Sequence, residues 1–288
     1  MYIKNKFSLI IVFILFSCTK EVFLNSSTVT DDTVFNCLYR PDSIYMSITT
    51  SVGLKDTVKE LSSPFTVLFS STLDTQLVKY NGRGFYQVSL HEGKEYQMRV
   101  NQTPSMLIAT AKDKIPLKIV PQKISFNYNV LTDKTFGQVS ELTITFADPS
   151  AQKNWYEIMV YGITDSGKTI CLVSSFDKVF KNEGLEDNAY YTSFIYSDEL
   201  IDGKEYSLKM QVSSDSYYGE KLAFEIHFRS ISESYYKYRK SIDKQIDANT
   251  PSLWDNKNGN KPEIYTNITG KHGIFGGFNE SIDTAYVE

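Results

Sequence analysis

The sequence has few of the side chains that usually carry metal or redox chemistry. Its 288 residues include three histidines and three cysteines. His91, His227 and His272 stand in separate contexts, and neither a His-x-x-x-His nor a Cys-x-x-Cys spacing occurs. Such spacings are the usual signatures of structural and catalytic metal sites. The sequence therefore gives no positive support for a metal ion, and we expect no cofactor.

The motifs of several large enzyme classes are missing as well. There is no G-x-S-x-G nucleophile elbow and no phosphate-binding P-loop. Residues 162–167 fit a turn between strands rather than a dinucleotide-binding loop, because no helix is expected after them. A catalytic pair of carboxylates is defined by its separation in space, so the sequence alone does not reveal one. We predict that the protein is not an enzyme.

An excess of positive charge and long apolar runs are absent too. The formal net charge is −4, from 30 basic and 34 acidic residues, and no basic run occurs. Nucleic-acid binding depends on neutralising phosphates, so nucleic acid is not an expected partner. The longest apolar run, residues 7–16, has ten residues, whereas a helix that spans a bilayer needs roughly 20.

The N-terminus has the features of a secretory signal. A basic start precedes the apolar run, and a small serine stands before Cys18, which is the order found in signal peptides. The sequence Leu-Phe-Ser-Cys that ends at Cys18 resembles the lipobox of bacterial lipoproteins, in which the signal peptidase cuts before a lipid-modified cysteine. We predict a signal peptide over residues 1–17, a membrane anchor at acylated Cys18 and a polar tether over residues 18–33. The expected location is the outer membrane, with its periplasmic and external faces both open.

After processing, only Cys37 and Cys171 keep free side chains. Each lies in an apolar, strand-like run, and the two are far apart in the sequence. Free cysteine commonly behaves as a small core residue, so we favour two buried thiols. A single disulfide is the alternative in an oxidising compartment.

Beyond residue 33 the sequence follows the period of β-strands. Apolar residues alternate with polar ones, as at Phe65, Val67 and Phe69, and Gly, Asn, Asp and Pro separate the runs. This pattern indicates antiparallel strands with one buried face. We predict a mainly β fold with two tandem antiparallel β-sandwiches of the immunoglobulin or fibronectin-III type, over residues 34–115 and 116–229.

A short match recurs in the two halves. Gly-Lys-Glu-Tyr ends at Tyr96 in the first half and at Tyr206 in the second, and an alternating strand follows each time. In immunoglobulin-like sandwiches, a tyrosine near the start of one strand bonds back to the backbone through its hydroxyl. Tyr96 and Tyr206 are placed for that role.

After residue 229 the apolar period becomes helical. The spacing of Ser230 and Glu233 is that of a capping box. The residues that form the apolar stripe are Ile231, Tyr235, Tyr238, Ile242 and Ile246. We predict a helix over residues 231–247 and then an irregular, glycine-rich tail, which together make up a C-terminal segment over residues 230–288.

Three segments of this C-terminal part resemble the DUF4249 lipoproteins of Bacteroidetes. They are residues 232–238, 262–268 and 270–277, and the first strand after the tether is also similar. The residues that match the family motif, whose role is unknown, are Tyr235, Tyr236, Asn267, Gly270, Gly273, Phe275, Gly276 and Gly277. Glycines in such a motif permit positive φ or close backbone approach, and we favour packing over ligand binding as their role.

The resemblance implies a cell-envelope lipoprotein accessory to a TonB-dependent outer-membrane receptor. Our leading hypothesis is therefore a non-enzymatic lipoprotein that binds a protein partner or ligand beside such a receptor. A fimbrial or adhesin-like subunit and a glycan-binding surface lipoprotein are alternatives. An envelope hydrolase is a further alternative and requires two carboxylates that face each other across a cleft.

Overall fold

The computed structural model describes residues 33–50, 60–61, 65–134, 136–185, 189–213, 223–249 and 262–287. The predicted signal peptide, Cys18 and nearly all of the predicted tether lie outside these residues. Within the described ranges, no helix is long and apolar enough to cross a membrane.

The described chain is built mainly from β-strands, as the alternating pattern predicts. Its two helices are α1 (Lys178–Asn182) and α2 (Glu233–Asn249). The strands are β1 (Thr33–Tyr39), β2 (Ser43–Thr50), β3 (Phe65–Ser70), β4 (Thr75–Tyr80), β5 (Gly84–Gln87), β6 (Glu95–Thr103), β7 (Met106–Lys114), β8 (Lys123–Asp133), β9 (Gly137–Ala147), β10 (Trp155–Thr164), β11 (Gly167–Ile170), β12 (Val173–Ser174), β13 (Phe194–Ser197), β14 (Glu205–Ser213), β15 (Ala223–Ile231) and β16 (His272–Tyr286).

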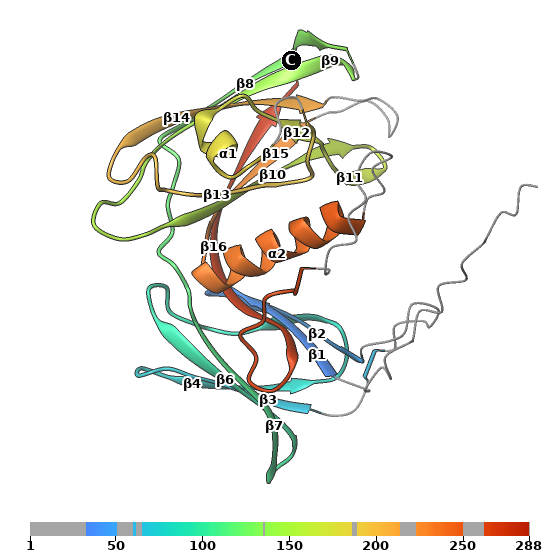
Figure 1. Ribbon diagram of the computed structural model, residues 1–288, viewed down its shortest axis with the longest axis vertical. Coiled ribbons are helices and arrows are strands. Elements are labelled where there is room, and N and C mark those ends of the chain that lie inside the picture. The colour runs from blue at the N-terminus through green and yellow to red at the C-terminus, as the bar shows by residue number, and fades with distance from the viewer. Residues whose placement is uncertain are drawn as a thin grey trace, which may run out of the picture.

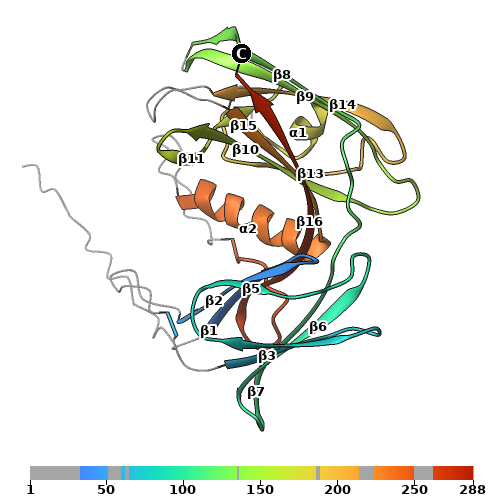
Figure 2. The same ribbon diagram turned by 180° about the vertical axis from the view of Figure 1, so that it is seen from behind.

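These strands form three sheets in a sandwich-like arrangement. The largest has the order β11-β10-β15-β16-β1-β2-β5, and β13 also pairs with β10. Two four-stranded sheets, β12-β14-β9-β8 and β4-β3-β6-β7, pack against its two ends. Figures 1 and 2 show the two layered halves, with β16 running from one to the other. The halves therefore share one sheet, and their immunoglobulin-like assignment stays a prediction.

Each half has its own apolar core, filled by alternate residues of the shared sheet. In β1, Phe35, Cys37 and Tyr39 point into the core against the β4-β3-β6-β7 sheet. In β10, Tyr156 and Ile158 point into the second core. The period of two leaves the intervening residues on the opposite face of the shared sheet, which is called the outer face below.

The predicted irregular tail is wrong, because most of it is the 15-residue strand β16. This strand pairs with β1 in parallel and with β15 in antiparallel orientation. Phe275 enters the first core, where its ring stacks on Tyr39 at 4.2 Å between centroids. Ile274 and Phe278 are buried on the outer face, where Phe278 packs against Tyr235 of α2. Burial on both faces and the glycines hide the alternation that normally identifies a strand.

Helix α2 begins two residues later than predicted, and its cap is a different serine. Ser230 belongs to β15 and makes no cap. Ser232 takes that place, because its Oγ accepts the backbone N–H of Tyr235 at 3.2 Å. The strand continues through Ile231, whose side chain is buried between the sheet and the helix, so β15 leads directly into α2.

Two other predictions can be checked within the described residues. Cys37 and Cys171 are both buried thiols, as favoured, and burial raises the pKa of the Cys37 thiol well above its usual value. Tyr96 accepts the backbone N–H of His91 at 2.8 Å, which is the expected tyrosine corner. The hydroxyl of Tyr206 donates to Asp177 instead, at 2.6 Å, so the second corner is not formed.

Candidate functional site

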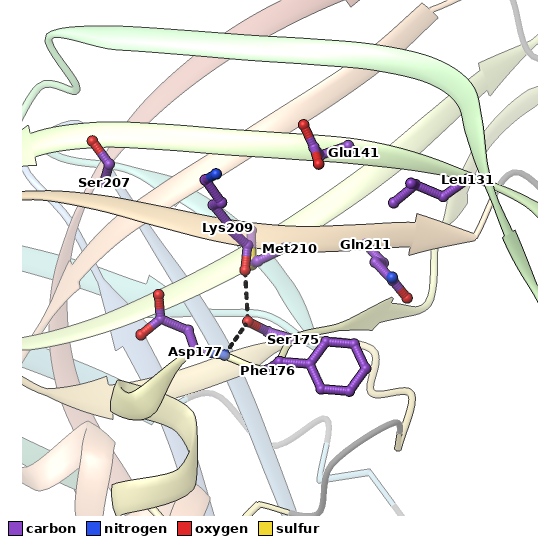
Figure 3. Close-up of a pocket in the computed structure, with 9 residues that line it drawn as sticks. All are labelled: Leu131, Glu141, Ser175, Phe176, Asp177, Ser207, Lys209, Met210 and Gln211. Carbon is purple, nitrogen blue, oxygen red and sulfur yellow. Dashed lines mark hydrogen bonds between the residues drawn. The ribbon is translucent and has the colours of Figure 1, made fainter.

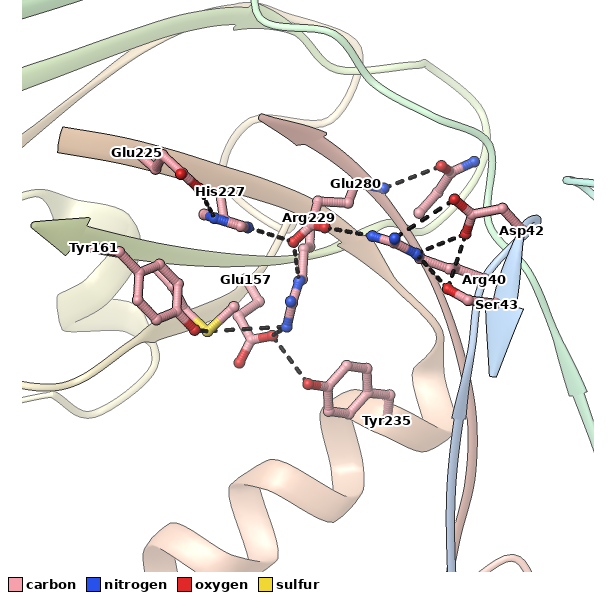
Figure 4. Close-up of polar contacts among 12 residues, drawn as sticks. Arg40, Asp42, Ser43, Glu157, Tyr161, Glu225, His227, Arg229, Tyr235 and Glu280 are labelled. Carbon is pink, nitrogen blue, oxygen red and sulfur yellow. Dashed lines mark hydrogen bonds and ion pairs between the residues drawn. The ribbon is translucent and has the colours of Figure 1, made fainter. Parts of the chain in front are cut away.

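The outer face of the shared sheet carries a network of charged side chains. Helix α2 covers one part of this face (Figure 1), and the network occupies the part beside it. Arg229 of β15 lies at its centre, between Glu157 of β10 and Glu280 of β16 (Figure 4). Alternate residues of each of these strands point into a core. The charged residues therefore lie on the opposite, outer face of the shared sheet.

Glu157 holds the helix to the sheet. Its side chain is fully buried and accepts from Arg229 Nη1 at 3.1 Å and from Arg239 Nη1 of α2 at 2.7 Å. The hydroxyl of Tyr235, also in α2, donates to the same carboxylate at 3.0 Å. A buried carboxylate is tolerated only when it is paired and hydrogen-bonded, and here two guanidinium groups balance it.

Glu280 links the two halves of the molecule. It accepts from Arg229 Nε and from Arg40 Nη1, at 2.7 and 2.8 Å, and Arg40 follows β1 of the first half. His227 Nδ1 lies 2.7 Å from the same carboxylate. Burial acts to raise the pKa of Glu280, but the hydrogen bonds from His227 and Arg229 and the charge of Arg229 outweigh it and hold the pKa at about 2.

The network ends at a histidine that the sequence presents as isolated. His227 Nε2 lies 3.2 Å from Glu225, which also pairs with Lys168. The ring of Tyr161 stands edge-on to His227, with 4.9 Å between centroids. His227 is therefore surrounded by carboxylates and an aromatic ring rather than by other metal-ligating histidines.

A groove of about 490 Å³ opens beside the network, where the two halves meet on the outer face. Its lining combines network residues with large apolar side chains: Leu38, Arg40, Ser43, Tyr45, Phe85, His227, Arg229, Phe278, Glu280 and Ile282. Phe85 is 78% exposed and Ile282 is 51% exposed. The Arg229 guanidinium lies 4.7 Å from the ring centroid of Phe278. The groove thus combines exposed apolar side chains with charged side chains that already pair with one another.

A second cavity, of about 370 Å³, lies on the outside of the β12-β14-β9-β8 sheet. Glu141 of β9 and Lys209 and Gln211 of β14 extend toward it (Figure 3). Ser175 fixes one wall, because its Oγ donates to the carbonyl of Lys209 at 2.6 Å and accepts the N–H of Asp177 at 3.0 Å. This cavity can offer charged and amide groups to a polar ligand.

One acidic cluster brings together carboxylates from separate loops. Asp148, Asp198 and Asp202 have oxygens within 4.8 Å of one another, an arrangement that sequence spacing does not reveal. Asp148 accepts the N–H of Gly203 at 2.9 Å and the hydroxyl of Tyr156. Burial raises the pKa of both Asp148 and Asp198. Carboxylate oxygens suit hard cations, but bonds within the loops already occupy the two buried members.

The glycines of the family motif lie where backbones come close together. A side chain on Gly273 would place its Cβ 2.0 Å from the Phe35 carbonyl oxygen, and one on Gly277 would place its Cβ 2.3 Å from that of Lys114. At Gly276 a Cβ would press on Tyr235 of α2, 3.1 Å away. Gly270 has φ +68° in the turn before β16 and open space around it. These positions let β16 pack against β1, α2 and the end of β7.

The other motif residues hold the same junction. The Asn267 side chain accepts the N–H of Phe275 at 2.9 Å and donates to its carbonyl at 2.7 Å. Tyr235 binds Glu157, as described above, and the Tyr236 hydroxyl donates to Glu183. The motif thus surrounds the join between β16 and α2. Of its members, only Tyr235 bonds directly into the charged network.

Sequence reasoning missed the network itself. Arg40 and Glu280 are 240 positions apart, and no local pattern connects them. Glu157 offered one signal, since it is an acidic residue inside the otherwise apolar run of β10. Glu280 offered none, because it lies in the segment that was predicted to be irregular.

Comparisons with known proteins place the chain in a family. No curated protein matches it. Among solved structures, it is similar to a protein of Bacteroides uniformis ATCC 8492 whose proposed role is carbohydrate binding. The alignment has 8% identity and a TM-score of 0.24, and it covers 89% of this chain and 99% of that one, a likeness too low to establish a common fold. The family model for the domain of unknown function DUF4249 matches residues 20–283. The chain therefore belongs to the DUF4249 family.

Proposed function

We propose that this protein is a non-enzymatic lipoprotein of the outer membrane that binds a protein partner, a TonB-dependent receptor, through the groove on its outer face. The observation that carries the proposal is the exposed apolar surface of the groove. Phe85 and Ile282 are large apolar residues in a concavity between the two halves, where they contribute little to either core. Exposed apolar patches of this kind mark interaction sites.

The composition of the groove suits a protein partner. Aromatic and arginine side chains are enriched at protein interfaces and dominate their hot spots, and the groove contains Tyr45, Phe85, Phe278, Arg40 and Arg229. The rings of Tyr45 and Phe85 are 5.1 Å apart. Because both arginines already bind Glu280, a partner would bury them without leaving an unpaired charge.

The same pairing supports a binding role rather than a catalytic one. Glu157, Glu280 and Glu225 each contact at least one cationic side chain. A general acid or base needs a pKa near the working pH, whereas the pKa of Glu280 is held at about 2.

The predicted anchor at Cys18 supports the proposed location. The sequence before it has the order of a signal peptide, and the 15 residues from Thr19 to Thr33 can reach roughly 50 Å when extended. Such a tether would let the groove meet a receptor that lies in the same membrane.

Cysteine replacement tests the anchor. Cys18→Ala should move the protein from the membrane fraction to the soluble fraction of disrupted cells, because the lipid attachment is lost. Immunoblotting of both fractions measures the change. A variant that stays fully membrane-bound would contradict the lipoprotein assignment.

Capture of the partner tests the groove. Native protein purified in mild detergent should bring a TonB-dependent receptor with it, identified by mass spectrometry. Phe85→Ser with Ile282→Ser should abolish this co-purification. Leu77→Ser is the matched control, because Leu77 is 60% exposed on β4, away from the groove. Repeated recovery of the native protein alone, or equal loss with the control, counts against the proposal.

A further inference from the structure

The second cavity, of about 370 Å³, is separate from the groove and shares no lining residue with it. It lies along β14, with β9 and the end of β8 on one side and the loop of residues 175–177 on the other (Figure 3). The groove belongs to the shared sheet, whereas this cavity belongs to the four-stranded sheet of the second half. It is therefore a concave site of its own.

Three long polar side chains extend toward the second cavity from two neighbouring strands (Figure 3). Lys209 and Gln211 are two residues apart on β14 and so lie on the same face of the sheet. Glu141 of β9 pairs directly with Gln211 across the sheet, which places their Cβ atoms about 5 Å apart. A carboxylate, an ammonium group and an amide thus converge on a small area.

These three groups keep hydrogen-bonding capacity for a ligand. Gln211 Oε1 accepts the hydroxyl of Tyr190 at 3.4 Å, so the side-chain NH₂ of Gln211 is left to donate. Glu141 Oε1 accepts from Asn127 at 3.4 Å, which leaves Oε2 as an acceptor. Within the described ranges, neither Glu141 nor Lys209 forms an ion pair.

An aromatic ring stands at the rim of the second cavity. Phe176 is 50% exposed and belongs to neither core. Its backbone is held on both sides, because Ser175 donates to the carbonyl of Lys209 and Asp177 accepts the N–H of Val179 at the start of α1. A fixed loop therefore presents this ring beside the polar side chains (Figure 3).

The combination of groups favours a neutral ligand with several hydroxyls. Glu141 and Lys209 have opposite charges, so an ionic ligand of either sign would face a like charge. Asp177 is already occupied, since it accepts the hydroxyl of Tyr206 at 2.6 Å. The faces of a sugar ring carry C–H groups that pack on aromatic rings, and its hydroxyls both donate and accept. A concavity with an aromatic side chain and a few polar groups is typical of small-ligand sites.

We propose that the second cavity binds one neutral sugar residue of a glycan. The ring of Phe176 packs against one face of the sugar. Glu141 accepts from the sugar hydroxyls, and Lys209 and Gln211 donate to them. Because Lys209 and Ser207 are exposed, water competes for these bonds, and we expect dissociation constants in the millimolar range. The site does not depend on the groove or on its partner.

Ligand-observed NMR titration of the full-length protein, in a detergent without a sugar head group, tests this proposal. The probes are the methyl glycosides of glucose, galactose, mannose and N-acetylglucosamine, which represent sugar residues linked within a glycan. At least one should bind. Phe176→Ala should weaken that binding about tenfold through the loss of ring packing. Glu141→Gln should weaken it about fivefold, because a charged acceptor becomes a neutral one.

Two control variants match these substitutions. Phe85→Ala also removes an exposed phenylalanine, but from the groove, and it should bind the sugar normally. Glu205→Gln neutralises an exposed carboxylate on β14 that does not line the second cavity, and it should also bind normally. Phe176→Ala should still co-purify with the receptor, so failure of the sugar site and failure of the groove are distinguishable. Circular dichroism checks the fold of each variant.

Alanine is the comparison ligand, because the two charges of a free amino acid would also match Lys209 and Glu141. Binding of alanine without binding of any glycoside would overturn the proposal, and so would binding of no probe at all. Native affinity in either Phe176→Ala or Glu141→Gln would overturn it as well. The same holds if a control variant loses as much affinity as the variant that it matches.

Discussion

At Gly273 the backbone of β16 lies so close to β1 that no side chain fits. This glycine also has φ +111°, a conformation that other residues rarely adopt. Both features follow from the parallel pairing that puts Gly273 opposite Phe35. A single residue therefore fixes how the last strand enters the sheet.

Substitution of Gly273 and of Gly270 distinguishes the cost of backbone strain from the cost of a steric clash. Gly273→Ala should lower the free energy of unfolding by at least about 3 kcal/mol, because strain and overpacking act together. Gly270→Ala should cost only about 1–2 kcal/mol, because its positive φ is strained but its surroundings are open. Urea unfolding of the two variants measures both values, and equal losses would contradict the packing role of Gly273.

Glu280 should make stability depend on pH in the acid range. Its pKa falls from an ordinary 4.5 to about 2 in the folded protein, so its contribution is complete above pH 4.5. As the pH falls toward 2 the folded carboxylate takes up a proton, and up to about 3 kcal/mol of stability should be lost. Urea unfolding between about pH 6 and pH 3 measures the slope.

Glu280→Gln is the comparison for that slope. This variant should be less stable at neutral pH, because Arg229 and Arg40 lose a shared carboxylate. It should also lose less stability than the native protein as the pH is lowered. Parallel pH profiles for the two proteins would show that Glu280 does not titrate as described.

At the scale of elements, α2 is held to the sheet by a buried carboxylate as well as by apolar packing. Tyr235 packs on Phe278, and both Tyr235 and Arg239 bind Glu157. The helix has only a modest apolar face, and many of its side chains are polar. Its position therefore depends strongly on one residue of β10.

Removal of that charge should loosen the helix. Glu157→Gln should destabilise the protein by about 3 kcal/mol, because Arg239 and Arg229, both partly buried, lose the carboxylate that they share, and only Arg229 keeps a second one in Glu280. Glu233→Gln removes an exposed partner of Lys237 within α2 and should change stability by less than about 0.5 kcal/mol. Thermal unfolding followed by circular dichroism distinguishes the two, and a small loss for Glu157→Gln would contradict this account of α2.

Over the whole molecule, β16 makes the two halves one sheet. It pairs with β1 of the first half and with β15 of the second, and Glu280 bonds to arginines from both. Neither half can complete its sheet without this strand. We expect the two halves to unfold together.

Thiol labelling tests this cooperativity. Cys37 reports on the first core and Cys171 on the second, and both are buried. Over a urea gradient the two should become reactive in the same concentration range, as in a two-state transition. Peptide mass spectrometry reads each site separately. Exposure of one cysteine well before the other would show that the halves unfold independently.

The sequence by itself determined the β-rich class, the buried cysteines and the place of the tyrosine corner at Tyr96. Each of these follows from local features, because the alternation of residues in a strand decides which side chains face a core. The resemblance to the DUF4249 family was also visible in the sequence, and the family model confirms that membership over residues 20–283.

Only the tertiary structure decided how the last strand and the charged network are arranged. Glycines carry no side chain, so the part of β16 that contains Gly273, Gly276 and Gly277 shows no apolar period. The pairing of Arg40 with Glu280 joins residues that are 240 positions apart, and such a contact depends on which strands become neighbours. Strand order is a property of the whole sheet, which is why the outer face and its charged network form only when the chain is folded.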